Sequence, residues 1–249
     1  MPTVDLDPSR HPVVLLDMNG TFVFGGDRFG PSEDYAATYR SLGGTAPGVA
    51  VDAAVGAVYD YLDRRYTDAA FHEAFPNVAD ALGAVPEAGG FSGRDLDLIA
   101  RTFARHELGR VPPEYARALC WLAGRHRLGL VTDIWAGREL WIQELARAGV
   151  LDLFDACVFS SDGSSVKPSP EPFRRALRAL GARASEAVVI GDSAHRDGGG
   201  ALAAGLPFIL VGAEEHPDAI GRVESLLALV PRSALDDSVP PPRTDARRR

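Results

Sequence analysis

The 249-residue sequence contains a single lysine, Lys167, although it carries 26 basic residues in all. It has only two cysteines, Cys120 and Cys157, which excludes the dense cysteine pattern of disulfide-stabilised domains. Both lie in apolar stretches and are predicted to be buried free thiols rather than a disulfide or a metal-binding pair. No apolar run reaches the ~18 to 20 residues of a membrane-spanning helix, and the first residues lack the pattern of a secretory signal. We therefore expect a cytoplasmic protein that does not bind membranes.

The sequence also lacks an excess of positive charge. Its formal net charge is −8 and its pI is about 5.3, whereas nucleic-acid binding requires clustered basic residues. The one basic run, residues 247–249, is interpreted as part of a solvated tail. We expect no nucleic-acid partner. A hydrophobic content of 46% and a charged content of 24% are typical of a folded globular protein.

Five short runs of aliphatic and β-branched residues are typical of buried parallel strands. They are residues 13–16, 128–131, 156–159, 187–190 and 207–211. Amphipathic patterns at 136–149, 170–181 and 195–205 predict helices between the later strands, several of them closed by glycine. Strands that alternate with helices of this length predict an α/β fold with a doubly wound parallel sheet.

One interval interrupts this alternation directly after the first strand. It contains amphipathic stretches without a buried strand, at residues 49–66, 77–84 and 95–108. We interpret it as a helical insert, and residues 21–30 are predicted to form a short hairpin that leads into it.

The domain organisation that follows has three parts. A core domain comprises residues 1–29 and 111–232, and a helical cap domain comprises residues 30–110. Residues 233–249 are rich in proline and charge and are predicted to be a disordered tail.

Polar residues follow four of the predicted strands, where an open parallel sheet binds its ligands. In chain order they are Asp17-Met18-Asn19-Gly20-Thr21, Thr132-Asp133, Lys167, and residues 191–197 with Asp192 and Asp197. Because the carboxyl ends of parallel strands share one edge of a sheet, we expect these residues to meet there.

Their chemical types suit the transfer of a phosphoryl group. A carboxylate such as Asp17 can attack phosphorus when a divalent cation neutralises the charge between them. Mg²⁺ prefers hard oxygen ligands, so Asp17, the backbone carbonyl of Asn19 and Asp192 form a candidate set, with Asp197 in support. Thr132 is the first candidate donor to the phosphate oxygens.

Further candidate donors to the phosphate come from the same segments. Lys167 offers an ammonium group, and the loop at Met18 and Gly20 offers N–H groups, with Gly20 permitting a sharp turn. Asp133 is predicted either to cap a helix or to offer its N–H to phosphate.

These segments resemble the four motifs of the haloacid dehalogenase superfamily, over about residues 11–30 and 112–212. The insert is similar to a C1-type helical cap, and the resemblance implies a Rossmann-like core. It further implies that Asp17 is the nucleophile, that Thr132 and Lys167 hold the phosphate, and that Asp192 binds Mg²⁺. The expected function is then that of a Mg²⁺-dependent phosphatase or phosphotransferase that acts on a small phosphorylated metabolite.

Asn19 departs from this pattern, because phosphatases of the superfamily usually have an aspartate there as general acid and base. An amide cannot exchange a proton usefully near neutral pH, and such help contributes about 10²- to 10⁴-fold in rate. Three interpretations stay open: slow hydrolysis, hydrolysis of esters with good leaving groups, and a binding or regulatory protein. The dehalogenase interpretation is disfavoured, because that chemistry needs no metal and the sequence keeps Asp192 and Asp197.

Several other residues allow two interpretations each. Asp192 and Asp197 could simply cap the following helix, and His195 is expected to face solvent. Trp135 is expected to serve packing. The helix at 49–66 carries aromatic and basic residues that could face the site and select a substrate, namely Tyr59, Tyr61, Arg64, Arg65 and Tyr66.

Overall fold

The computed structural model describes residues 6–236. Within them, Arg232–Ala234 form a short 3-10 turn. The remainder of the predicted tail, residues 237–249, and its basic run lie outside the described residues. None of the helices in the described part combines the length and the apolarity that crossing a membrane requires.

A single parallel sheet of six strands forms the core, in the order β3-β2-β1-β4-β5-β6. The strands are β1 (Val13–Leu16), β2 (Arg127–Thr132), β3 (Phe154–Phe159), β4 (Ala187–Gly191), β5 (Phe208–Val211) and β6 (Gly221–Val223). The five predicted strands are confirmed, and β6 was missed because its three half-buried residues form no apolar run. The central strand β1 pairs with both β2 and β4, so the residue that follows it lies where the strand order reverses.

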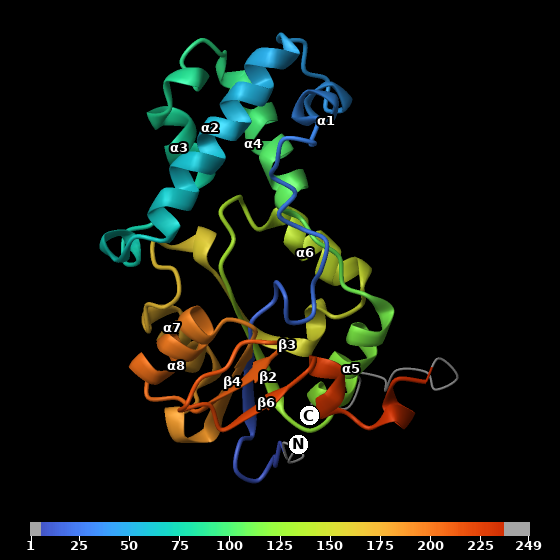
Figure 1. The fold of residues 1–249 in the computed structure, drawn as a ribbon. Coiled ribbons are helices and arrows are strands. Elements are labelled where there is room, and N and C mark those ends of the chain that lie inside the picture. Colours follow the sequence, from blue (N-terminus) through green and yellow to red (C-terminus); the bar gives the residue numbers. More distant parts are fainter. Residues whose placement is uncertain (1–5, 237–249) are drawn as a thin grey trace.

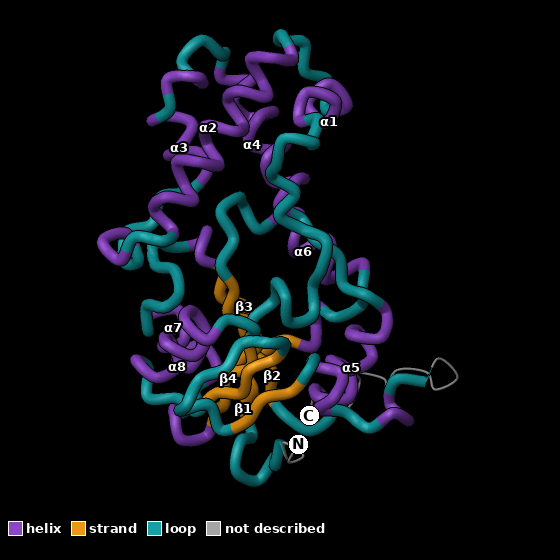
Figure 2. The backbone as a smooth tube through the Cα atoms, in the orientation of Figure 1, coloured by secondary structure: helices purple, strands orange, loops and turns teal. Residues whose placement is uncertain are grey.

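Helices cover both faces of this sheet (Figure 2). On one face, α7 (Glu171–Leu180) and α8 (Gly199–Ala203) share an apolar cluster with Val13 and Leu15. On the other, α5 (Pro113–Ala123) and α6 (Glu139–Arg147) pack with Val14 and Leu16. Both faces of β1 are therefore buried, and each fully buried aliphatic side chain contributes ~1.5 to 3 kcal/mol.

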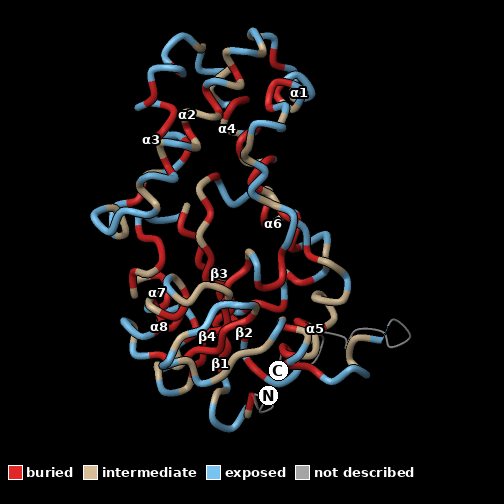
Figure 3. Tube along the Cα trace, viewed as in Figure 1, coloured by how far each residue is buried: buried red, intermediate tan, exposed pale blue. Residues whose placement is uncertain are grey.

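Four further helices lie together beyond the carboxyl ends of the strands (Figure 1). They are α1 (Tyr35–Ser41), α2 (Gly48–Tyr66), α3 (Val78–Ala84) and α4 (Gly93–Glu107). They bury an apolar cluster of their own around Val55, Leu62 and Phe103, and this cluster also includes Ala136 and Val166 from loops of the sheet. Buried segments within these helices are coloured red in Figure 3. The three helices predicted in this interval are present, and α1 was not predicted.

The chain enters and leaves this helical group through two segments that lie side by side. Phe24 and Arg110 exchange backbone hydrogen bonds of 3.0 and 2.8 Å. A Cβ on Gly26 would lie 2.5 Å from the carbonyl oxygen of Glu107, so only glycine allows this close approach. The predicted hairpin within residues 21–30 is wrong, because Phe24 pairs with a partner more than eighty residues away. The domain boundaries stay a prediction.

Candidate active site

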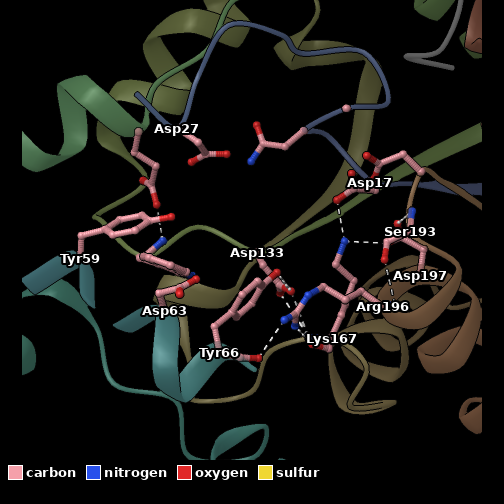
Figure 4. Close-up of a pocket in the computed structure, with 15 residues that line it drawn as sticks. Asp17, Asp27, Tyr59, Asp63, Tyr66, Asp133, Lys167, Ser193, Arg196 and Asp197 are labelled. Atoms are coloured by element: carbon pink, nitrogen blue, oxygen red, sulfur yellow. Dashed lines mark hydrogen bonds and ion pairs between the residues drawn. The ribbon is translucent and has the colours of Figure 1, made fainter. Parts of the chain in front are cut away.

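A cavity of about 420 Å³ lies between the carboxyl ends of the strands and the helical group. Asp17 comes from the end of β1, Asp133 from the end of β2, and Asp192 from the end of β4. Tyr59 and Tyr66 reach the cavity from α2, as the labelled side chains in Figure 4 show. The expected meeting of polar residues at this edge is therefore present.

Lys167 joins two buried carboxylates. Its Nζ donates to Oδ1 of Asp17 at 2.5 Å and to Oδ1 of Asp197 at 2.7 Å. All three side chains are less than 7% exposed. Burial on its own would lower the pKa of Lys167, but the carboxylates, Asp17 first, raise it well above its usual range. Lys167 is therefore a fixed positive charge beside the candidate nucleophile.

Asp17, Asp192 and Asp197 offer oxygen atoms that all lie within 4.8 Å of one another. Burial, together with the other two carboxylates, raises the pKa of Asp17 to about 8, although Lys167 opposes the shift. Burial and Asp197 likewise raise the pKa of Asp192 to about 6. The three carboxylates thus carry more negative charge than one ammonium balances. Such a set of hard oxygen atoms fits a divalent cation such as Mg²⁺.

Gly20 brings the loop after β1 against Asp192. Its φ is +75°, and a Cβ at this position would lie 2.0 Å from Oδ2 of Asp192. The side chain of Met18 is fully buried in the core, so only its backbone can contact a ligand. Asn19 lines the cavity and is half-buried.

Thr132 is buried at the end of β2, and its hydroxyl has no hydrogen-bond partner among the described residues. An unpartnered buried hydroxyl is costly, and an oxygen of a bound phosphate would satisfy it. Thr132 itself does not contribute to the cavity lining.

The side chain of Asp133 does not cap a helix, and the binding of phosphate by its backbone N–H stays a prediction. Its carboxylate accepts hydrogen bonds from the backbone N–H of Lys167 at 3.2 Å and from the hydroxyl of Tyr66 at 2.9 Å. It therefore ties the lysine loop to helix α2. Arg196 reinforces this connection, because its guanidinium donates to the carbonyl of Lys167 at 2.7 Å and to that of Tyr66 at 2.8 Å.

Three further carboxyl groups in the cavity were not found from the sequence, those of Glu107, Asp27 and Asp63. Glu107 ends α4 and accepts hydrogen bonds from the backbone N–H groups of Trp135 and Ala136. Asp27 adopts a left-handed conformation, with φ of 52°. One signal could have identified Glu107, since a carboxylate at the C-terminal end of a helix is unfavourable without a partner.

Of the aromatic and basic residues that could face the site, some line the cavity and others do not. Tyr59, Tyr66 and Trp135 line the cavity. Arg65 instead stacks on the ring of Tyr61, with its Cζ 3.4 Å from the ring centroid. His195 is exposed, as expected, and both cysteines are free as predicted, although they are half-buried and not fully buried.

The helix that follows β4 is capped by Ser193, whose side chain accepts from the N–H of Arg196. Asp197 accepts from the backbone N–H of Ser193 at 3.0 Å through one oxygen and from Lys167 through the other, so it contacts this helix start and the site at once.

Comparison with known proteins identifies relatives of this chain. A family model described as a haloacid dehalogenase-like hydrolase matches residues 12–205. A phosphoserine phosphatase of Thermus thermophilus is 33% identical over 137 residues, which cover 54% of each chain. The pyrophosphatase PpaX of Bacillus pumilus is 30% identical over 159 residues, covering 56% of this chain and 73% of the relative. The chain spans about half the length, or less, of the first curated relatives that it matches.

The fold is shared with solved structures. A 2-haloacid dehalogenase from Pseudomonas syringae superposes with a TM-score of 0.60 and covers 90% of this chain and 98% of its own. Their sequences are 24% identical, so this likeness concerns the fold alone.

Proposed function

This chain belongs to the haloacid dehalogenase-like hydrolases, and on that premise we propose that it is a Mg²⁺-dependent phosphohydrolase with Asp17 as its nucleophile. The observation that carries the proposal is the cluster of Asp17, Asp192 and Asp197 around Lys167 at the carboxyl ends of β1 and β4. The names of the relatives, a phosphoserine phosphatase and a pyrophosphatase, support phosphate chemistry. The substrate is a small phosphorylated metabolite.

Each residue of the cluster has a separate task in this proposal. Asp17 forms an aspartyl-phosphate, which water then hydrolyses. Asp192, Asp197, one oxygen of Asp17 and the backbone carbonyl of Asn19 hold Mg²⁺, which would neutralise charge on the transferring phosphoryl group. Lys167 orients Asp17 through the hydrogen bond of 2.5 Å.

The phosphate oxygens need donors that do not move during the reaction. The hydroxyl of Thr132 is buried and unpartnered among the described residues, so it is available for one of them. Backbone N–H groups of the loop at Met18 and Gly20 supply others. We further propose that residues 30–110 act as a cap, which excludes water from this cavity.

Asn19 determines which esters can react. It cannot protonate a departing alkoxide, so the protein hydrolyses esters whose leaving group is already a weak base, such as acyl or aryl phosphates. The alternative is a protein that binds a phosphorylated ligand with Mg²⁺ and does not turn it over. The half-buried position of Asn19 in the cavity lining is compatible with both.

The test measures Mg²⁺-dependent phosphate release from acetyl, aryl and alkyl phosphates. We expect the wild type to hydrolyse acetyl phosphate and Asn19→Asp to gain about 10²- to 10⁴-fold on alkyl phosphates, with a much smaller gain on acetyl phosphate. Asp17→Asn should abolish all phosphate release, and its retained activity would contradict the nucleophile assignment. Ligand-induced thermal stabilisation that requires Mg²⁺, without any product, would favour the binding alternative.

A further inference from the structure

The cavity contains no cation that is free to bind a second anionic group. Seven of its lining side chains are carboxylates and two are cations, Lys167 and Arg196. Lys167 is engaged by Asp17 and Asp197. Arg196 donates to two backbone carbonyls, and its Cζ lies 3.2 Å from the ring centroid of Tyr66. A leaving group with its own carboxylate or second phosphate would therefore meet mainly negative charge.

Two of the carboxylates, Asp27 and Asp63, accept no hydrogen bond and form no ion pair through their side chains within residues 6–236. Burial raises the pKa of Asp27, and the nearby charge of Arg28 lowers it only in part. Asp63 comes from α2 and Asp27 from the segment after β1, and both lie around Tyr59 in Figure 4. Burial, followed by the carboxylates of Asp63 and Asp27, raises the pKa of Tyr59, which is consistent with this proximity. Negative charge from two elements thus converges on one part of the cavity.

Aromatic rings form the wall beside these carboxylates. The ring centroids of Tyr59 and Trp135 are 5.5 Å apart, and those of Tyr66 and Trp135 are 5.4 Å apart. All three residues line the cavity. The faces of such rings attract cations, most strongly when water is partly excluded. The ring of Tyr66 already holds Arg196, and one face of Tyr59 stacks on Phe29 with the centroids 4.7 Å apart. A ligand would therefore meet the parts of Tyr59 and Trp135 that line the cavity.

We propose that the phosphate ester hydrolysed here carries a cationic amine on its leaving group, and that this amine binds between Asp27 and Asp63 against Tyr59 and Trp135. The inference rests on the proposed function, because the phosphate must lie at Asp17 for the leaving group to occupy this part of the cavity. A second metal ion is not the favoured occupant. Among the described residues, the only group of side chains that could hold a metal comprises Asp17, Asp192 and Asp197.

The test compares esters of the same shape that differ in charge. Phosphocholine is paired with 3,3-dimethylbutyl phosphate, phosphoethanolamine with propyl phosphate, and phosphoglycolate represents an anionic leaving group. Phosphate release is measured with Mg²⁺ in Asn19→Asp, in which the missing acid no longer limits turnover of these alkyl esters, and in the wild type, in which slower rates are expected. We expect kcat/KM to favour at least one cationic ester about tenfold over its neutral counterpart, with phosphoglycolate the slowest.

Variants of the two carboxylates, with a control in α2, connect this preference to the structure. Asp63→Asn should reduce the ratio of cationic to neutral kcat/KM about two- to fivefold, chiefly through KM, and Asp27→Asn should act in the same direction. Asp60→Asn is the matched control, because Asp60 is exposed on α2 and does not line the cavity. It should leave the ratio unchanged.

The outcomes separate this inference from the proposed function. Turnover without preference for either cationic ester, or a preference that neither Asp27→Asn nor Asp63→Asn alters, overturns the cationic substrate and leaves the hydrolase. If no ester in the panel is hydrolysed and acetyl phosphate is also inert, the proposed function fails, and the inference fails with it.

Discussion

Glu107 provides a sharp test of the electrostatics of the cavity. The side chain is 3% exposed, and its carboxylate accepts from the backbone N–H of Trp135 at 2.5 Å and from Nε1 of Trp141 at 3.4 Å. Burial raises the pKa of Glu107 from its ordinary 4.5 to about 7, and these hydrogen bonds lower it only in part. The folded protein therefore holds a proton on Glu107 more tightly than the unfolded chain does.

The magnitude follows from the two pKa values. A difference of about 2.5 pH units corresponds to about 3 kcal/mol in the free energy of unfolding. Because the folded pKa is the higher one, the contribution is fully present below pH 4.5 and is lost as the pH rises to 7 and above. At and above neutral pH, Glu107 ionises while it is buried, and this ionisation lowers the free energy of unfolding.

The assay is urea unfolding of the wild type and Glu107→Gln between pH 4.5 and 8. As the pH rises, the wild type should lose about 3 kcal/mol in its free energy of unfolding relative to Glu107→Gln. Titration of Asp17 and Asp192 is common to both proteins and cancels. Glu87→Gln, at an exposed position, is the control substitution. A difference for Glu107→Gln that does not change with pH would refute the reasoning.

Three further perturbations test the site. Gly20→Ala places a Cβ against Asp192, so it should weaken Mg²⁺ binding in calorimetry while circular dichroism stays that of the wild type; unaltered affinity would contradict the close approach. Lys167→Met leaves two buried carboxylates uncompensated and should cost about 3 to 5 kcal/mol in urea unfolding, part of which Asp17→Asn should restore in the double variant. Mg²⁺ at about 100 times its Kd should stabilise the wild type by about 2.7 kcal/mol, reversed by a chelator, and an absent shift would argue against the metal site.

The core and its catalytic edge could be predicted because they depend on local patterns. A parallel strand that is buried on both faces leaves a continuous apolar run, and β1, β2 and β4 each have one. The site residues Asp17 and Thr132 come directly at the ends of such runs, so the strands locate them.

The residues that were missed depend on partners far along the chain. Glu107 bonds to the loop after β2, and Phe24 pairs with Arg110 rather than forming a hairpin. Arg196 contacts Tyr66, which is 130 positions away. No window of local sequence contains both members of such a pair.

The same limit explains the errors in secondary structure. The three residues of β6 are half-buried, and α1 covers only seven residues, so neither gives a periodic signal that stands out from a loop. Both are specified by the elements they pack against, β5 and α2.

The pairing of Phe24 with Arg110 has an evolutionary consequence. The two ends of the segment between them are hydrogen-bonded to each other. The segment can therefore lengthen, shorten or diverge in sequence without moving either end. Doubling the length of such a closed segment costs only about 0.6 kcal/mol in chain entropy. Selection can therefore rebuild the wall that faces the substrate while Asp17, Lys167 and the sheet beneath them are inherited intact.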